Sequence, residues 1–307
     1  MTDTPDLSVE LGFLRLKNPI LAASGTFGCG LEFTPFIDLN ELGGFVVKGL
    51  YFEPRSGNPP PRLVETAAGL INAIGLQGIG VKHFTETILP QLKDLQTAVL
   101  VNICGESEEE YVRVADYLNG HEGIAAYELN ISCPNVREGG RCPAQNAEST
   151  YSLVRRVKQM SARPILTKLT PNVTDITLIA RSAEEAGSDA VCLVNTFLAM
   201  AIDIHTRRPK LANIYGGLSG PAIKPIALRM VHQTAAVLSI PVIGMGGIMS
   251  AADVVEFLLA GASAVQVGTA NFIQPDILPQ IVEDLRRFLV KNNIKQITDL
   301  VGGIKSP

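Results

Sequence analysis

The chain has no excess of positive charge: 26 Lys and Arg are balanced by 30 Asp and Glu, which gives a formal net charge of −4. This balance provides no basic surface for nucleic acid or for an anionic membrane. No apolar run approaches the roughly 18 residues that a membrane span needs. The first ten residues carry three carboxylates and no Lys or Arg, so we expect neither a secretory nor a transit peptide, and a cytoplasmic location.

The cysteines and histidines form no recognisable metal site. The five cysteines are an odd number at wide spacings, and no Cys-x-x-Cys pair occurs. This spacing argues against a disulfide framework, a zinc site and a self-contained iron–sulfur cluster. None of the four histidines follows an apolar run of strand length, which argues against a histidine general base. We therefore expect reduced thiols and no metal.

Apolar runs of strand length alternate with stretches of helical period along the chain. Repeated strand–helix alternation indicates a parallel α/β protein, and eight strands is the number that closes a (β/α)8 TIM barrel. An open doubly wound sheet is the alternative, although no Gly-x-Gly-x-x-Gly follows an early strand. The expected strands are Ile20–Ala23, Gly44–Val47, Ala98–Val101, Ile124–Leu129, Pro164–Thr167, Ala190–Val194, Ile240–Met245 and Ala264–Val267. The expected helices are Gly80–Leu95, Ser107–Leu118, Glu148–Met160, Val173–Ala186, Ala222–Leu238, Ser250–Ala260 and Gln280–Val290.

Two segments add to this pattern. Leu7–Leu16 alternates apolar and polar residues around Gly12, which predicts a short N-terminal hairpin. Leu50–Gly80 is rich in Pro and Gly, and we expect a long irregular insertion there, at the C-terminal face of the barrel. No low-complexity linker divides the chain, so residues 1–307 are expected to form a single domain.

The residues at the ends of the expected strands are polar or glycine. Because the carboxyl ends of the strands meet at one face of a barrel, these residues predict a polar small-molecule site. They are Ser24-Gly25, Lys48-Gly49, Asn102, Asn130, Lys168, Asn195-Thr196, Gly246-Gly247 and Gly268-Thr269. The last two pairs present backbone N–H groups after strands seven and eight, where barrels of this type frequently bind a phosphate. A phosphorylated ligand or cofactor is therefore expected.

Lysines and one cysteine carry the candidate chemistry. Lys48 and Lys168 each lie at the end of an apolar run that is too hydrophobic to lie on the surface. Each lysine could pair with an anion, form a Schiff base or stabilise the negative charge of a reduced flavin. Cys133 precedes Pro134 in a polar loop, which makes it the best-placed group for proton transfer. Cys104 and Cys142 could approach the same mouth, whereas Cys29 and Cys192 are expected to be packing residues.

The sequence resembles the dihydroorotate dehydrogenases over nearly its full length, most closely the class 1B catalytic subunit. The motifs that carry the resemblance are Lys17-Asn18-Pro19-Ile20, Ala23-Ser24-Gly25, Asn72-Ala73-Ile74-Gly75-Leu76, Asn130-Ile131-Ser132-Cys133-Pro134-Asn135, Thr167-Lys168-Leu169, Gly217-Leu218-Ser219-Gly220 and Gly244-Met245-Gly246-Gly247. The resemblance implies a barrel with one FMN per chain that oxidises (S)-dihydroorotate to orotate in pyrimidine (UMP) synthesis.

The resemblance also implies a role for each motif residue. Cys133 would take the proton from C5 of dihydroorotate while C6 delivers hydride to the flavin, and Lys168 would stabilise negative charge near N1 of reduced FMN. The residues implied to bind the substrate are Lys48, Asn72, Ala73, Ile74, Gly75, Leu76, Asn130, Asn195 and Thr196. Those implied to bind FMN are Ser24, Lys48, Gly49, Asn102, Asn130, Lys168, Val194 and Gly220, with Gly246, Gly247, Gly268 and Thr269 at its phosphate.

Class 1B resemblance implies a homodimer core joined to a partner subunit in a heterotetramer. That partner would carry FAD and a 2Fe–2S cluster and pass electrons to NAD, because this chain has no cluster ligands and no dinucleotide fingerprint. Cys133 and the short acidic start argue against the membrane-linked class, whose base is a serine. The segment Arg141-Cys142-Pro143-Ala144 departs from the family pattern.

Four alternatives stay open at this point. Within the family these are a class 1A homodimer that uses fumarate, and a relative that acts on another dihydropyrimidine. A Schiff-base aldolase with Lys168 as nucleophile is a different class of enzyme. A barrel that binds a phosphorylated ligand without catalysis is the last; both non-family hypotheses leave the motif around Cys133 without a role.

Overall fold

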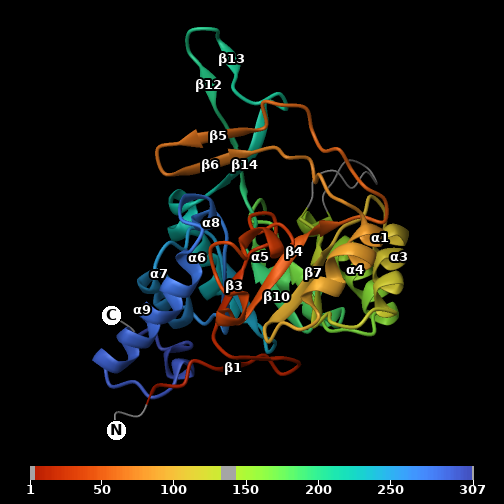
Figure 1. The fold of residues 1–307 in the computed structure, drawn as a ribbon. Helices are drawn as coiled ribbons and strands as arrows, with labels where there is room; N and C mark the ends of the chain where they lie inside the picture. Colours follow the sequence, from red (N-terminus) through yellow and green to blue (C-terminus); the bar gives the residue numbers. More distant parts are fainter. Residues whose placement is uncertain (1–3, 133–142, 306–307) are drawn as a thin grey trace.

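The computed structural model describes residues 4–132 and 143–305 and confirms the predicted barrel. Eight parallel strands close on themselves in the order β10-β15-β16-β3-β4-β7-β8-β9 (Figure 1). They are β3 (Ile20–Ala22), β4 (Gly44–Leu50), β7 (Ala98–Ile103), β8 (Ala126–Asn130), β9 (Ile165–Lys168), β10 (Ala190–Leu193), β15 (Val242–Met245) and β16 (Ala264–Val267). Strands buried on both faces are largely apolar, which is why the runs in the sequence located them to within a few residues.

Helices surround the barrel as an outer layer, and several begin at capping side chains that the sequence displays. Ser107, Asn146, Asp175 and Ser250 each accept a backbone N–H of the first turn. The helices are α3 (Glu108–Asn119), α4 (Ala147–Met160), α5 (Ile176–Glu185), α6 (Lys224–Ala235), α7 (Ala251–Leu259), α8 (Ala270–Ile273) and α9 (Ile277–Lys291). The predicted helix at 80–95 is instead α1 (Val81–His83), a π-helical turn η3 (Phe84–Ile88) and α2 (Leu89–Leu92). Short 3-10 turns are η1 (Leu31–Phe33), η2 (Leu39–Glu41), η4 (Pro143–Gln145), η5 (Pro221–Ile223) and η6 (Ile297–Leu300).

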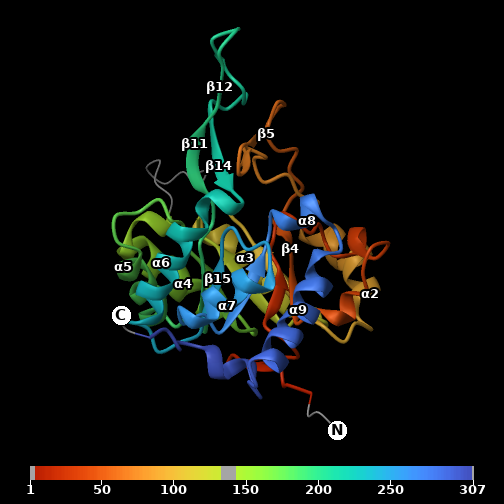
Figure 2. The ribbon, with the colours of Figure 1, turned by 90° about the vertical axis from the view of Figure 1, so that its left-hand side faces the viewer.

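A second sheet projects above the barrel, and it corrects the prediction of an irregular insertion at 50–80. Within that insertion, β5 (Leu63–Thr66) and β6 (Gly69–Asn72) form an antiparallel hairpin. The hairpin joins β14 (Tyr215–Ser219) and β11 (Phe197–Met200) in the order β11-β14-β6-β5 (Figures 1 and 2). The small hairpin of β12 (Ile202–Asp203) and β13 (Arg208–Pro209) extends the projection. The prediction was wrong because the hairpin is stabilised by strands that come far later in the chain.

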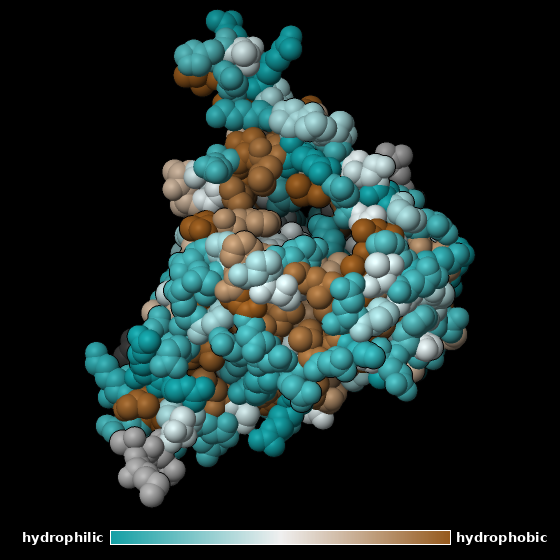
Figure 3. All heavy atoms as spheres, in the orientation of Figure 1, coloured by the Kyte–Doolittle hydropathy of each residue, from teal (hydrophilic) through white to brown (hydrophobic). Residues whose placement is uncertain are grey.

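Large apolar side chains are exposed on this projecting sheet (Figure 3). They are Leu63, Leu198, Met200, Ile202, Ile204, Ile214 and Tyr215. Several large apolar side chains exposed on one part of a surface are a feature of interaction faces.

The opposite end of the barrel is covered by the predicted N-terminal hairpin, β1 (Val9–Glu10) and β2 (Arg15–Leu16) (Figure 1). In the part of the chain that the structure describes, no helix is long and apolar enough to cross a bilayer. The barrel interior is apolar except for one layer of buried polar side chains near the carboxyl ends of the strands. That layer contains Asn102, Glu128, Lys168 and Gln266.

Candidate active site

The carboxyl ends of β8 and β9 bring together two residues that were predicted to form the site. Asn130 and Lys168 are the last residues of their strands and face each other in register. Two other predicted strand ends lie slightly earlier than their strands' last residues. Lys48 lies within β4, at a register shift between Val47 and Leu50, and Asn102 precedes the final residue of β7.

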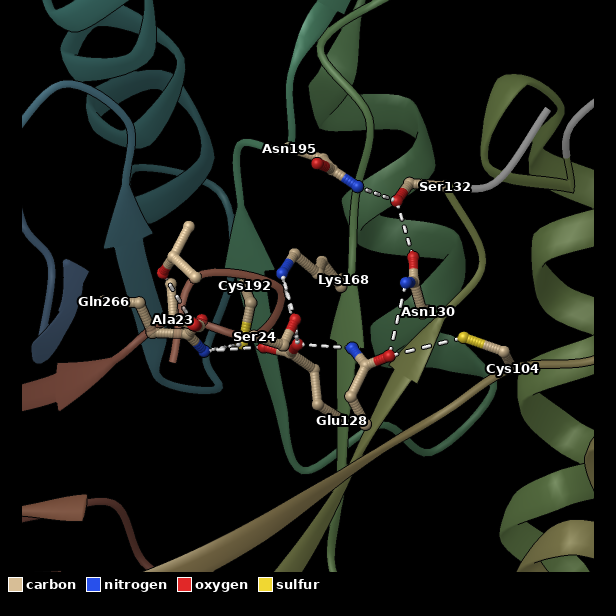
Figure 4. A network of polar contacts seen from close by, with 12 residues as sticks. Ala23, Ser24, Cys104, Glu128, Asn130, Ser132, Lys168, Cys192, Asn195 and Gln266 are labelled. Carbon is tan, nitrogen blue, oxygen red and sulfur yellow. Dashed lines mark hydrogen bonds and ion pairs between the residues drawn. The ribbon is translucent and has the colours of Figure 1, made fainter. Parts of the chain in front are cut away.

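Glu128, a residue for which the sequence suggested no role, is the centre of the polar layer (Figure 4). Its side chain is fully buried. One carboxylate oxygen, Oε1, accepts hydrogen bonds from Asn102 Nδ2 at 2.6 Å, Ser24 Oγ at 3.1 Å and Lys168 Nζ at 3.2 Å. The other oxygen, Oε2, accepts one from Gln266 Nε2 at 2.6 Å. The carboxylate is thus satisfied on both oxygens, as a buried charge must be.

Two opposing effects determine the ionisation of Glu128. Burial acts to raise the pKa of Glu128, while the Lys168 ammonium and the hydrogen bonds from Gln266, Asn102 and Lys168 act to lower it. The stabilising contacts prevail, so the pKa of Glu128 lies below its ordinary value and the carboxylate is an anion at neutral pH. Lys168 also donates to Ser24 Oγ at 3.0 Å, so Ser24, Glu128 and Lys168 form a closed triangle.

A chain of amides and hydroxyls lies above this layer (Figure 4). Asn130 Nδ2 donates to Asn102 Oδ1 at 3.3 Å, and Asn130 Oδ1 accepts from Ser132 Oγ at 2.8 Å. Asn195 Nδ2 donates to the same Ser132 hydroxyl at 2.5 Å. Tyr111 fixes the strand end, because its hydroxyl donates to the Asn130 carbonyl at 2.7 Å. The predicted substrate ligands Asn130 and Asn195 are therefore joined through Ser132, which the sequence did not single out.

Lys48 approaches the mouth from the β4 side, in different surroundings. Burial lowers the pKa of Lys48, and the positive charges of Lys168 and Arg62 lower it further. Cys104 and Cys29 act in the opposite direction, and no carboxylate of the described residues is among these main influences. A Cβ built on Gly25 would lie 3.8 Å from Lys48 Nζ, which places the ammonium beside the loop after β3.

The predicted phosphate loops converge. A Cβ built on Gly247 (φ +76°) would lie 2.8 Å from the Gly220 carbonyl oxygen, so only glycine allows the two loops to approach this closely. Thr269 Oγ1 donates to Ser219 Oγ at 2.8 Å, which ties the loop after β16 to the same place. Gly246 packs beside Val194, and Gly268 lies near Ala23. The residues predicted to hold a phosphate thus form one cradle.

The predicted substrate loop 72–76 lies under the projecting sheet. Asn72 ends β6, and its Nδ2 donates to the Gly217 carbonyl at 3.2 Å. A Cβ on Gly217 would collide with Thr196 Oγ1, so Asn72 and Thr196 lie on either side of one glycine. The backbone of the loop is held by Asn58, whose N donates to the Ile74 carbonyl and whose Nδ2 donates to that of Ala73. Gly75 and Leu76 both have positive φ, which makes a tight turn.

Cys133, the predicted base, and Cys142 lie outside the described residues. The flanks of their segment are joined, because Ala144 N donates to the Ile131 carbonyl at 3.3 Å. Of the remaining thiols, Cys29 and Cys192 are buried, as expected for packing residues. Cys104 is buried too, and its Sγ lies 3.4 Å from Asn102 Oδ1. Within residues 4–132 and 143–305, no cluster of three or more His, Cys, Asp and Glu could hold a metal ion.

The Asn102 side chain packs against Gly49. A Cβ on Gly49 would lie 2.7 Å from Asn102 Oδ1, so the glycine leaves room for that side chain. The Asn102 side chain is fully buried and holds Asn130 and Glu128 in place. Its implied contact with a flavin stays a prediction.

Sequence reasoning missed Glu128, Gln266 and Ser132. One signal was present for Glu128: an acidic residue within the apolar run 124–129 has no reason to be there unless it is paired. Nothing local pointed to Gln266, because its contact comes from the opposite side of the barrel.

Comparison with known proteins supports the same assignment. The dihydroorotate dehydrogenase family model matches residues 6–289. A relative from Bacteroides thetaiotaomicron, named dihydroorotate dehydrogenase B (NAD(+)), catalytic subunit, is 49% identical over 98% of this chain and 99% of its own length. A relative from Solibacter usitatus, provisionally named dihydroorotate dehydrogenase A (fumarate), is 53% identical with the same coverage.

A solved structure agrees at the level of the fold. The dihydroorotate dehydrogenase of Eimeria tenella, in complex with ferulenol, superposes with a TM-score of 0.80 at 22% identity, covering 98% of this chain and 89% of that one. The family model and the two relatives span nearly the whole sequence, and the barrel agrees with them. The chain is a member of the dihydroorotate dehydrogenase family.

Proposed function

We propose that this chain oxidises (S)-dihydroorotate to orotate in pyrimidine synthesis, as an FMN-dependent oxidoreductase. The observation that carries the proposal is the barrel mouth, where two lysines, linked amides and a glycine cradle lie together in a chain of this family. We also propose that residues 1–307 act as one FMN-binding domain in the cytoplasm.

The residues present fit FMN. The cradle of Gly220, Gly246-Gly247 and Gly268-Thr269 offers backbone N–H groups and the Thr269 hydroxyl, and a Cβ on Gly220, Gly246 or Gly247 would lie 2.8 Å from a neighbouring atom of the protein. The rest of the proposed FMN set is Ser24, Lys48-Gly49, Asn102, Asn130, Lys168 and Val194, of which Ser24, Asn102, Asn130 and Lys168 belong to the hydrogen-bonded layer around Glu128. FMN would supply the hydride acceptor, which no side chain of the chain can provide.

The side chains would bind and orient the substrate and move one proton. Asn72, Asn130, Asn195 and Thr196 offer amides and a hydroxyl that complement the donors and acceptors of a dihydropyrimidine ring, with the backbone of residues 73–76 beside them. Lys48, for which no carboxylate of the described residues is a main influence, would pair with the carboxylate of dihydroorotate. Cys133, one residue beyond Ser132, would accept the proton from C5 as a thiolate.

The arrangement disfavours the Schiff-base hypothesis for Lys168. A Schiff-base lysine must lose its proton to act as a nucleophile. Lys168 Nζ lies 3.2 Å from the buried Glu128 carboxylate and donates to Ser24 Oγ, and a lysine that attacks a carbonyl would have to leave both contacts. Borohydride trapping of a carbonyl substrate on Lys168 would contradict this argument.

The test of the function is direct. The purified protein should be yellow, and dihydroorotate should bleach it without oxygen. Cys133→Ala should keep FMN but lose roughly 10²- to 10⁴-fold in flavin reduction at neutral pH. Cys29→Ala, which changes a buried thiol, is the matched control. A colourless protein that does not take up FMN contradicts the proposal, and unchanged reduction in Cys133→Ala removes Cys133 as the base.

We propose that the chain is a class 1B catalytic subunit, whose electrons finally reach NAD. Two copies would form a homodimer core, joined in a heterotetramer to a partner subunit. That partner would carry FAD and a 2Fe–2S cluster and reduce NAD. The class is supported by the relative named as a catalytic subunit of an NAD(+) enzyme. The homodimer is supported by the apolar side chains exposed on the projecting sheet, which a second copy of the chain would bury. Class 1A is the second candidate, because the Solibacter usitatus relative is named for fumarate. Turnover with fumarate by the isolated chain would favour class 1A, whereas turnover with NAD only in a co-purified complex would favour class 1B.

A further inference from the structure

Glu128 is the most highly connected charged side chain inside the barrel. Its four donors come from four places in the barrel: the loop after β3 (Ser24), β7 (Asn102), β9 (Lys168) and β16 (Gln266). In the order of the closed sheet, β16 lies directly opposite β8, so the Gln266 contact crosses the whole interior. A carboxylate held from all sides has one position, and it fixes the groups that bind it.

Glu128 itself cannot touch a ligand in the mouth, because none of its surface is exposed. Lys168 is 4% exposed and lies between Glu128 and the mouth. Any effect of Glu128 on a bound molecule must therefore pass through Lys168 or through the amides above it.

The charges around Lys168 make Glu128 its one counter-ion among the described residues. The titratable groups that interact with Lys168 include Glu128 from β8, Lys48 from β4 and Cys192 from β10. Burial raises the pKa of Cys192 well above its ordinary value, and the Glu128 charge raises it further, so Cys192 stays a neutral thiol. Lys48 repels Lys168. Among the described residues, Glu128 is the carboxylate that forms an ion pair with Lys168.

We propose that Glu128 is a positioning residue, which holds the Lys168 ammonium in one place so that Lys168 presents a fixed positive charge to FMN. This inference deepens the proposed function and rests on it for the identity of FMN. The triangle with Ser24 supports it, since Lys168 Nζ makes contacts of 3.0 and 3.2 Å that restrict its rotamer. Without the carboxylate, a nearly buried lysine would lose its proton much more readily.

The experiment is a pH titration of the FMN absorption spectrum in wild type, Glu128→Gln and the double variant Glu128→Gln/Lys168→Met. The spectrum responds to charge near the ring and needs no substrate. Glu128→Gln should show a new ionisation that wild type lacks, and the double variant should lose it. Above that ionisation, reduction by dihydroorotate should fall about tenfold per pH unit in Glu128→Gln, as for a single deprotonation.

Asp189→Asn is the matched control. Asp189 forms an ion pair with Lys158, so this variant makes the same carboxylate-to-amide change beside a lysine. Asp189 directly precedes β10 and therefore lies at the opposite end of the barrel from the mouth. It should show no new ionisation. Glu128→Asp retains the negative charge, so it should lack the new ionisation while reducing flavin at least about tenfold more slowly than wild type, because the Lys168 ammonium is displaced.

The possible outcomes are distinct. A folded, FMN-bound Glu128→Gln without a new ionisation overturns the proposal, and so does an ionisation that persists in the double variant. If Glu128→Gln does not fold, Glu128→Asp decides: wild-type rates of flavin reduction overturn the proposal, and slowed reduction with normal FMN retention supports it. Failure of wild type to react with dihydroorotate would instead count against the proposed function, and the spectral titration would still test Glu128.

Discussion

On the β9 side of the barrel mouth, the Lys168 ammonium lies 3.2 Å from the fully buried Glu128 carboxylate, whereas on the β4 side no carboxylate of residues 4–132 and 143–305 is among the main influences on the pKa of Lys48. The two lysines repel each other across the same mouth, and burial lowers the pKa of Lys48. The Lys168 wall therefore contains its own counter-ion, whereas the Lys48 wall has no carboxylate paired with its lysine among the described residues.

The difference separates a structural cation from a binding cation. A buried pair that is complete within the protein gains little from a further anion. An uncompensated ammonium recovers part of its lost solvation when an anionic ligand arrives. We therefore expect Lys168 to be important for the fold and for the electrostatics at FMN, and Lys48 to be important for substrate binding.

The largest expected effect is the opposite response of stability to removal of each lysine. Lys168→Met leaves Glu128 buried and unpaired, which should cost about 3–5 kcal/mol of the free energy of unfolding. Lys48→Met removes a partly buried cation that has no ion-pair partner among the described residues, so stability should be unchanged or higher. Urea unfolding at several FMN concentrations measures both variants and separates the contribution of FMN binding. Equal losses in the two variants would abolish the distinction.

The barrel could be predicted from the sequence and the projecting sheet could not, for a physical reason. Strands such as β7 and β10 are buried on both faces, so they appear as continuous apolar runs. In contrast, β5 is almost wholly exposed and has no such run. It is a strand because β6 pairs with it and β14 pairs with β6, and pairing between distant segments leaves no local pattern.

The residues of the site also fall into those that could be predicted from the sequence and those that could not. Lys168 and Asn130 could be found because they end apolar runs, and the geometry of a barrel then places them at one mouth. Glu128 could not be given a role, because its meaning depends on Gln266, which reaches it from the opposite strand. A pattern within one strand indicates which side chains face inward but not which of them meet across the interior.

A second prediction concerns the substrate, and it sharpens the assignment of Lys48. Loss of a charge-assisted contact to the dihydroorotate carboxylate should cost about 2–3 kcal/mol, so Lys48→Met should lower kcat/KM roughly 30- to 150-fold. Steady-state kinetics with FMN-saturated protein provide the measurement. Lys82→Met, which changes an exposed lysine near Phe52, is the control and should resemble wild type. A value for Lys48→Met within about threefold of wild type would contradict the role.

A third prediction tests the paired wall with acid. The pKa of Glu128 is lowered in the folded state, so its stabilising contribution is present above the ordinary value of 4.5 and is lost as pH falls through the folded value. Wild type should therefore be more stable than Glu128→Gln at neutral pH, and the gap in Tm should close below about pH 4.5 as the wild-type carboxyl takes up its proton. Each kcal/mol corresponds to roughly 2 °C for a chain of this size. A gap that stays constant down to pH 3 or so would show that shape, not charge, makes Glu128 important.

The smallest expected effect belongs to Cys29, a thiol beside the uncompensated lysine. A Cys29 thiolate would neutralise Lys48. However, burial raises the pKa of Cys29, and the negative charge of Glu32 raises it further, to about 12. The thiol is then neutral wherever the enzyme works, and Lys48 stays uncompensated. Cys29→Ala should change kcat/KM by less than about twofold, and iodoacetamide at about pH 8 should leave Cys29 unmodified in the native protein. Rapid alkylation of Cys29, measured by peptide mass spectrometry, would mean that a thiolate forms there. In that case both walls of the mouth would contain a compensated lysine, and the contrast between them would fail.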